Sequence, residues 1–190
     1  PFDPKGYKLV LVDSVVKHEL ASSAYNDRRK SCENVVAALK NKYPDKTIET
    51  LRDADWDMLE SVKADVSEED MKRAVYVLGE KDRVLAVCEA LNAGDYETVG
   101  QKMYETHKGL SKDYEVSCEE LDYLNDIAKE NGVTGSRIMG GGFGCCTINL
   151  VKDELHDKFI EDVKAKYEAK YGKTPKIYDV VISEGSRKIC

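Results

Sequence analysis

A glycine-rich segment between two short β-type runs sets the strongest limit on the fold. Four of the five residues from Gly140 to Gly144 are glycine. In the run that follows, Cys146, Ile148 and Leu150 alternate with more polar neighbours, a period of two that is typical of a strand. A shorter run, 137–139, precedes the glycines. The pattern predicts a hairpin of two strands joined by a glycine loop.

The purpose of this loop is open at the level of the residues alone. A chain that only has to turn needs one or two glycines, and the excess costs folding entropy. Bare backbone N–H groups are suited to phosphate. However, a P-loop needs Lys and Ser or Thr after its last glycine, where this chain has Cys145 and Cys146. A dinucleotide fingerprint needs a following helix, where a strand is predicted here. A structural hairpin and a ligand loop are equally good interpretations.

Composition narrows the class of protein. The chain has 190 residues, 42% of them hydrophobic, which predicts a globular domain with a real core. The formal net charge of -7 argues against nonspecific nucleic-acid binding. No apolar run approaches membrane-spanning length, and no signal peptide is visible. Because the chain starts with Pro1 instead of Met, we expect it to be a piece of a longer protein.

The cysteines argue against a metal site. None of the six cysteines has the spacing of a metal ligand set. Adjacent Cys145 and Cys146 are expected to point to opposite faces of a strand, which suits neither a chelate nor a disulfide. Together these features predict a reducing, cytoplasmic setting.

The order of the remaining patterns predicts one α+β domain. Strands are expected at 7–16 and 177–182, with an ambiguous stretch at 48–66 that holds a short helix near 56–59. Helices are expected at 18–43, 69–92, 96–108, 117–132 and 153–171. Ser117 with Glu120 reads as a capping box for the fourth helix, and Asp153 as the cap of the fifth.

The resulting order is strand, several helices, strand, strand, helix, strand. This is the β-α-β-β-α-β order of a split βαβ, ferredoxin-like sandwich, with extra helices inserted in the first crossover. We expect a four-stranded, mostly antiparallel sheet with helices packed on it.

Few side chains carry a chemical signal by themselves. Tyr25 falls at helical spacing and is interpreted as a core residue, although Ser22 and Ser23 beside it would let a ligand come close. Lys17 ends the first strand, where ligands collect in α/β folds. The histidines are interpreted as solvated (His18), structural (His107) and surface (His156). No Ser-His-Asp, Cys-His or metal-ligand constellation can be assembled.

Two segments together resemble the galactokinases, members of the GHMP family of small-molecule kinases. The segment from Asp13 to Arg29 (DSVVKHELASSAYNDRR) looks like the galactokinase stretch that runs from a strand into a helix and holds a sugar-contacting tyrosine. The segment from Gly135 to Thr147 (GSRIMGGGFGCCT) looks like the third conserved motif of the family. Further matches lie at 73–77 and 113–122, so the resemblance covers essentially the whole chain.

The resemblance implies transfer of the ATP γ-phosphoryl group to the anomeric hydroxyl of galactose, with Mg²⁺. Tyr25 would hydrogen-bond the sugar, and Lys17 falls where relatives often have an arginine near the transferring phosphate. The active-site glycine loop would consist of Gly140, Gly141, Gly142, Phe143 and Gly144. Met139 and Cys145 replace the threonine and glycine common in the family, which weakens any grip of this loop on phosphate.

The family's sugar-binding segment, serine-rich phosphate loop and catalytic aspartate do not occur here. Residues 1–190 are therefore expected to be a galactokinase-like C-terminal domain that lacks the N-terminal catalytic half, with no catalytic residue and no metal ligand. That missing half would bind most of the ATP and Mg²⁺, so the fragment alone is expected to be inactive. The expected partners are galactose, ATP and the N-terminal domain, with no nucleic acid and no membrane.

Three alternatives stay open. The complete protein would be a kinase for N-acetylgalactosamine or another sugar, a noncatalytic galactose-sensing paralogue, or an independent interaction domain. Sugar selectivity would be set mainly by residues outside this chain.

Overall fold

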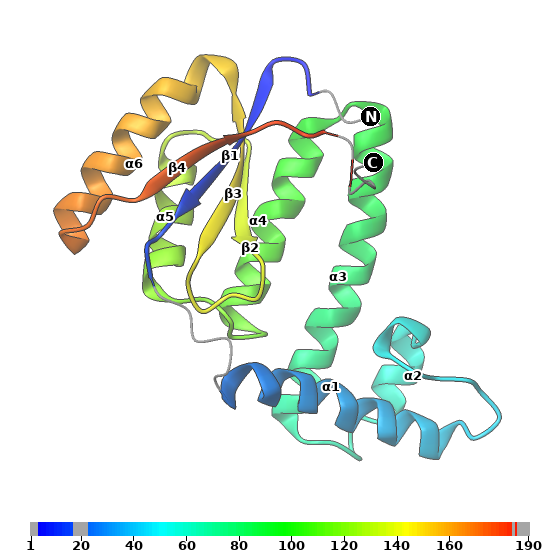
Figure 1. The fold of residues 1–190 in the computed structure, drawn as a ribbon. Helices are drawn as coiled ribbons and strands as arrows, with labels where there is room; N and C mark the ends of the chain where they lie inside the picture. The colour runs from blue at the N-terminus through cyan, green and yellow to red at the C-terminus, as the bar shows by residue number, and fades with distance from the viewer. Residues whose placement is uncertain (1–3, 17–22, 184, 186–190) are drawn as a thin grey trace, which may run out of the picture.

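A four-stranded sheet forms the centre of the structure, a computed structural model that describes residues 4–16, 23–183 and 185. The strands are β1 (Tyr7–Asp13), β2 (Gly135–Met139), β3 (Cys146–Lys152) and β4 (Lys176–Val180). Their order in the sheet is β2-β3-β1-β4, and each neighbouring pair is antiparallel (Figure 1). The predicted hairpin is therefore confirmed as β2 and β3, with Met139 opposite Cys146.

The helices follow the predicted split arrangement. Between β1 and β2 lie α1 (Ser23–Lys42), α2 (Trp56–Ser61), α3 (Glu68–Ala93), α4 (Tyr96–Lys112) and α5 (Glu119–Glu130). Helix α6 (His156–Tyr171) connects β3 to β4. Short 3-10 turns occur at Leu51–Asp53 and Asp153–Leu155. The ferredoxin-like order with extra helices in the first crossover is confirmed. None of the helices described is long and apolar enough to cross a membrane.

One face of the sheet packs against α5 and α6. Alternation along β1 places Val10 and Val12 on this face, because successive strand residues point to opposite sides. Their cluster is completed from the two helices and β3 by Leu124, Ile127, Val151, Phe159, Val163 and Tyr167. A smaller cluster joins Leu150 of β3 to α3 and α4, and α4 runs alongside β2 (Figure 1).

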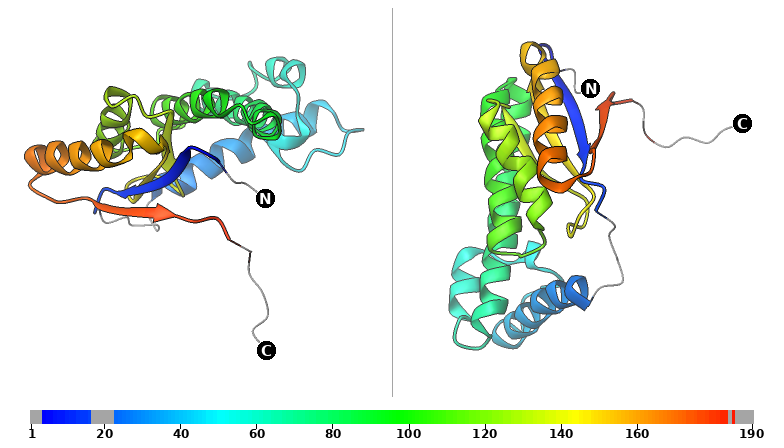
Figure 2. Two further views of the ribbon diagram at one scale, coloured as in Figure 1. Left: turned by 90° about the horizontal axis from the view of Figure 1, so that it is seen from above. Right: turned by 90° about the vertical axis from the view of Figure 1, so that its left-hand side faces the viewer.

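A second core lies at one end of the long helix α3, apart from the sheet. It joins α3 to α1, α2 and the first 3-10 turn through Val35, Leu39, Ile48, Leu51, Met58, Leu59, Val62, Ala74 and Leu78. Figures 1 and 2 show α1 and α2 at this end of α3. Helix α1 is therefore positioned by α3 and not by the sheet.

Three local expectations are wrong. Strand β1 stops at Asp13 instead of Val16, because Val15 has a φ of 56° and its N–H donates to the Asp13 carboxylate at 2.8 Å. The capping box at Ser117 does not form, because the Ser117 hydroxyl donates to Asp122 at 2.5 Å. Asp153 opens a 3-10 turn instead of capping α6, whose N-cap is Leu155.

His156 is also corrected, from a surface residue to a buried one. Its Nε2 lies 2.8 Å from an oxygen of Asp179 on β4, and its Nδ1 lies 2.8 Å from an oxygen of Asp157. The charged sequence of α6 gives no sign that His156 is buried, because its cover comes from the 3-10 turn and from β4 and not from the helix itself.

Candidate functional site

The glycine loop, residues 140–144, lies where the end of β1, the start of α1 and the α4–α5 segment (residues 113–117) come together. The Ser14 N–H and hydroxyl, just after β1, each donate to the Cys145 carbonyl at 2.8 Å. The Phe143 N–H donates to the Val116 carbonyl at 2.6 Å. The Arg28 guanidinium carbon of α1 lies 5.8 Å from the Phe143 ring centroid. These three elements and the loop define the candidate site.

Gly142 is required by close approach of the chain's own backbone, and Gly144 by its positive φ in a tight space. A Cβ at Gly142 would lie 2.2 Å from the Val116 carbonyl oxygen, and the φ of this residue is 81°. At Gly144, with a φ of 133°, a Cβ would meet Val16 at 3.1 Å. Gly140 has open space around it, and it is exposed together with Gly141. Within residues 140–144, Gly140 and Gly141 are the exposed glycines, and they form the tip of the loop.

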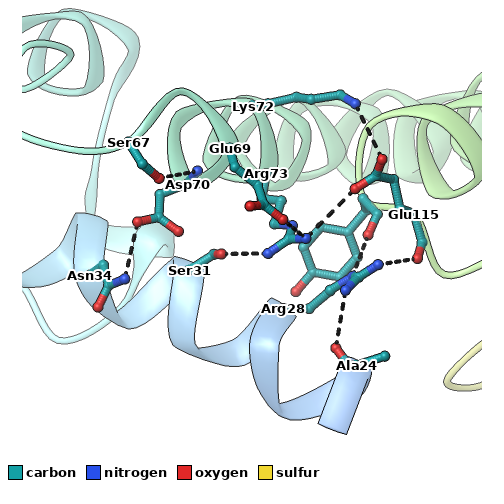
Figure 3. Close-up of polar contacts among 11 residues, drawn as sticks. Ala24, Arg28, Ser31, Asn34, Ser67, Glu69, Asp70, Lys72, Arg73 and Glu115 are labelled. Carbon is teal, nitrogen blue, oxygen red and sulfur yellow. Dashed lines mark hydrogen bonds and ion pairs between the residues drawn. The ribbon is translucent and has the colours of Figure 1, made fainter. Parts of the chain in front are cut away.

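Arg28 ties α1 to the α4–α5 segment. Its Nε donates to the Tyr114 carbonyl at 3.0 Å and its Nη2 to the Glu115 carbonyl at 2.6 Å, while Nη1 reaches the Ala24 carbonyl at 3.4 Å (Figure 3). Such fixed donors suit Arg, because its planar guanidinium offers several N–H groups in one geometry. The segment that bears Val116, which contacts the glycine loop, is thus held by the first turns of α1.

Arg73 of α3 holds the same segment from the other side. Its guanidinium is buried, donates to the Ser31 hydroxyl at 2.8 Å, and pairs with Glu69 one turn earlier on α3. It also lies 3.6 Å from the Glu115 carboxylate, which Lys72 approaches at 3.7 Å (Figure 3). Because two arginines from two helices converge on Glu115, α1, α3 and the α4–α5 segment form one connected unit.

Tyr25 lies on α1 one turn before Arg28. The residue is 47% exposed, so the interpretation as a core residue is wrong. The face of α1 that packs on α3 begins further along the helix, at Ser31 and Cys32, and continues through Val35 and Val36. Periodicity identifies a helix face but not how far the neighbouring helix covers it. The structure therefore presents Tyr25 as an accessible phenol beside the anchored turn.

Lys17 and His18 lie outside the described residues, and so does Ser22. The structure thus brings Tyr25 and the glycine loop into one region through Arg28 but does not place Lys17. Arg28, Arg73 and Glu115 were not identified as site residues from the sequence. Two features of the sequence could have identified the arginines: Arg28 lies one turn from Tyr25, and Arg73 interrupts the apolar pattern of α3.

His107 is buried between α4 and α5. This position agrees with the interpretation of His107 as a structural group. Its Nε2 lies 3.2 Å from Asp122, whose carboxylate also accepts hydrogen bonds from the Ser111 and Ser117 hydroxyls. Burial lowers the pKa of His107 to about 4, although Asp122 acts in the opposite direction. The imidazole is therefore neutral near pH 7 and joins two helices.

The polar groups around the glycine loop are engaged with other parts of the chain. Among residues 4–16, 23–183 and 185, no group of three or more His, Cys, Asp or Glu side chains could hold a metal ion. Arg28 and Arg73 already have protein partners, and the Phe143 N–H donates to Val116.

The comparisons with known proteins agree with this arrangement. Residues 87–169 match the family model described as GHMP kinases C terminal. The galactokinase of Clostridium acetobutylicum is 42% identical over 185 residues, which are 97% of this chain and 47% of that protein. The galactokinase of Thermotoga maritima is 38% identical over 190 residues, which are 100% of this chain and 51% of that protein.

The fold comparison points the same way. The crystal structure of Lactococcus lactis galactokinase complexed with galactose matches with a TM-score of 0.89 and 28% identity, over 100% of this chain and 48% of that chain. The chain therefore spans about half the length of the relatives that it matches. Residues 87–169 carry the C-terminal domain of the GHMP kinase family, and the whole chain is similar to the C-terminal part of the galactokinases that it matches.

Proposed function

We propose that residues 1–190 form the C-terminal domain of a galactokinase, which transfers the γ-phosphoryl group of ATP to galactose to give galactose 1-phosphate. The observation that carries this proposal is the match of the whole chain, in fold and sequence, to galactokinases, one of them complexed with galactose. The free thiols of the described cysteines support a cytoplasmic location.

Tyr25 is the proposed sugar contact. This residue is exposed, and its hydroxyl can both donate and accept a hydrogen bond, as a sugar hydroxyl requires. Arg28 holds the same turn of α1 against the α4–α5 segment, and that segment contacts the glycine loop through Val116. The exposed tip Gly140–Gly141 would border the same sugar site. Lys17 is proposed near the transferring phosphate on the family resemblance alone.

ATP and Mg²⁺ would be bound mainly by an N-terminal domain outside this chain. Phosphoryl transfer depends on positioning and on stabilisation of the phosphate charge. The described residues offer an exposed tyrosine and a glycine loop that contacts Val116, so this chain alone is not expected to phosphorylate galactose.

The test compares this chain with the polypeptide expressed from its full reading frame, by ADP-coupled assay with galactose, N-acetylgalactosamine and no sugar. We expect galactose phosphorylation by the longer polypeptide and none by the 190-residue chain. Preference for N-acetylgalactosamine would favour the alternative sugar kinase. Galactose binding without turnover by the longer polypeptide would favour a galactose sensor. Galactose phosphorylation by the isolated chain would refute the proposal that catalysis requires the N-terminal domain.

Substitution of Tyr25 tests its role in the same assay. Tyr25→Phe should raise KM for galactose about tenfold, since one hydrogen bond contributes about 1.4 kcal/mol, and should leave KM for ATP unchanged. Tyr123→Phe is the matched control, because this ring packs against Tyr171 within the α5–α6 layer. An unchanged galactose KM in Tyr25→Phe would remove Tyr25 from the sugar site.

A further inference from the structure

The thiols of Cys145 and Cys146 lie side by side at the base of the glycine loop. Their sulfur atoms are 3.6 Å apart. Adjacent residues of a regular strand point to opposite faces, and that geometry is the basis on which the sequence argues against a chelate. The structure overturns this expectation, because β3 starts at Cys146 and Cys145 lies outside it with a φ of 69°.

The left-handed backbone at Cys145 belongs to a run of unusual conformations. Phe143 has a φ of 58° and Gly144 a φ of 133°. A non-glycine residue with positive φ is uncommon and persists only where surrounding contacts hold it. The strand alternation is therefore broken at the one peptide that separates the two thiols, and both sulfurs come to the same side.

The surrounding hydrogen bonds hold this pair in place. The Cys145 carbonyl accepts two hydrogen bonds from Ser14, whose side chain is fully buried. Cys146 is paired within the sheet to Asp13 on β1 and to Met139 on β2. Because the backbone on each side is fixed, the two thiols need little reorganisation to bond the same atom, which lowers the entropic cost of chelation.

The two thiols differ in accessibility. Cys145 is exposed, whereas Cys146 is 8% exposed. Burial, together with the Cys145 thiol, raises the pKa of Cys146 to about 12, so this group is a protonated thiol near neutral pH. A reagent would reach Cys145 first, and Cys146 would then close the chelate from inside.

We propose that Cys145 and Cys146 form a two-sulfur binding site for a soft, thiophilic centre, of which trivalent arsenic is the representative class. Thiol sulfur is a soft ligand and favours soft centres over hard cations. With an organic arsenic(III) oxide, two As–S bonds form while the As–O bonds and both S–H bonds break. The oxygen leaves as water with the two thiol protons. Arsenic stays trivalent, so the step needs no oxidant or reductant.

The other described cysteines supply contrasting single thiols. Cys32 contacts the Tyr114 hydroxyl at 3.7 Å, Cys88 is exposed on α3, and Cys118 is the N-cap residue of α5. A single thiol forms one As–S bond, which a competing monothiol readily displaces. A linked pair resists such competition, because the second bond forms within the same molecule.

The test treats this 190-residue chain, kept reduced with a phosphine, with phenylarsine oxide and follows intact mass, free thiols and peptide mapping. We expect a single arsenical group, the loss of two titratable thiols, and both bonds on the peptide that contains Cys145 and Cys146. The adduct should survive excess 2-mercaptoethanol and be removed by 2,3-dimercaptopropanol.

Three variants complete the test. Cys145→Gly removes the exposed thiol at a position whose positive φ suits glycine. In this variant the concentration of 2-mercaptoethanol that removes the arsenical group should fall by roughly a hundredfold or more. Cys146→Ser should do the same, whereas Cys88→Ser should behave as the unmodified chain. The proposal is overturned if monothiol strips the original adduct as easily as that of Cys145→Gly, or if mapping places the two bonds elsewhere. No step of the test depends on kinase activity, so its outcome is independent of the proposed function.

Discussion

Acidification should destabilise this chain through His107. The side chain is 6% exposed between α4 and α5, and burial lowers the pKa of His107 from 6.5 to about 4. In the unfolded chain the same ring is solvated and titrates near 6.5. Between these two values the unfolded state binds more protons than the folded state. The free energy of unfolding should therefore fall as the pH falls through this window.

The magnitude follows from the two pKa values. A separation from 6.5 to about 4 corresponds to about 3 kcal/mol once the pH is below both values. The stabilising contribution is complete above pH 6.5 and is lost progressively toward pH 4. Between pH 7.5 and pH 5, linkage predicts a loss of about 2 kcal/mol from His107.

His156 acts with the opposite sign and has to be separated. Burial disfavours its charged form, but hydrogen bonds from the ring to Asp179 and Asp157 outweigh this and raise the pKa of His156. Its contribution is therefore present below pH 6.5 and is lost as the pH rises through the raised pKa. In the unmodified chain it masks part of the effect of His107.

Urea denaturation of matched variants at pH 7.5 and pH 5 separates the two groups. Compared with His107→Gln, the original chain should lose about 2 kcal/mol more on acidification. Asp179→Asn removes one hydrogen-bond partner of His156. In this variant the free energy of unfolding should fall more between pH 7.5 and pH 5 than it does in the original chain. NMR titration of the ring should show His107 neutral at pH 5. Titration of His107 near pH 6.5, or identical pH dependence in the original chain and His107→Gln, would refute the reasoning.

Two further predictions concern the supports of the candidate site. Gly142→Ala should lower the free energy of unfolding by more than about 2 kcal/mol, because its Cβ would lie 2.2 Å from the Val116 carbonyl oxygen at a positive φ. Gly140→Ala, also at positive φ but in open space, should cost only about 1 kcal/mol, and equal losses in urea melts would contradict this. Arg73→Met should cost about 2 to 3 kcal/mol, since it leaves Ser31 and Glu115 without their buried partner. Arg29→Met, which breaks an exposed pair with Glu33, should cost less than about 0.5 kcal/mol, and a similar loss in both variants would show that burial of Arg73 is unimportant.

The sequence by itself was sufficient for the architecture. The period of two after the glycines predicted β3, and the helical spacing elsewhere predicted the inserted helices, so their order indicated the split sandwich. These patterns are informative because each reports locally which side of an element is buried. The segments from Asp13 to Arg29 and from Gly135 to Thr147 were also enough to indicate the kinase family.

Only the tertiary structure decided how the site is built. It showed that Gly142 is required by Val116, that Tyr25 projects beyond the cover of α3, and that His156 is enclosed by β4. It also turned the Cys145 and Cys146 thiols to the same side. Each of these features depends on a contact between distant segments or on a left-handed residue outside regular structure. Local periodicity carries no information about either, because it assumes a regular backbone and does not identify the neighbour.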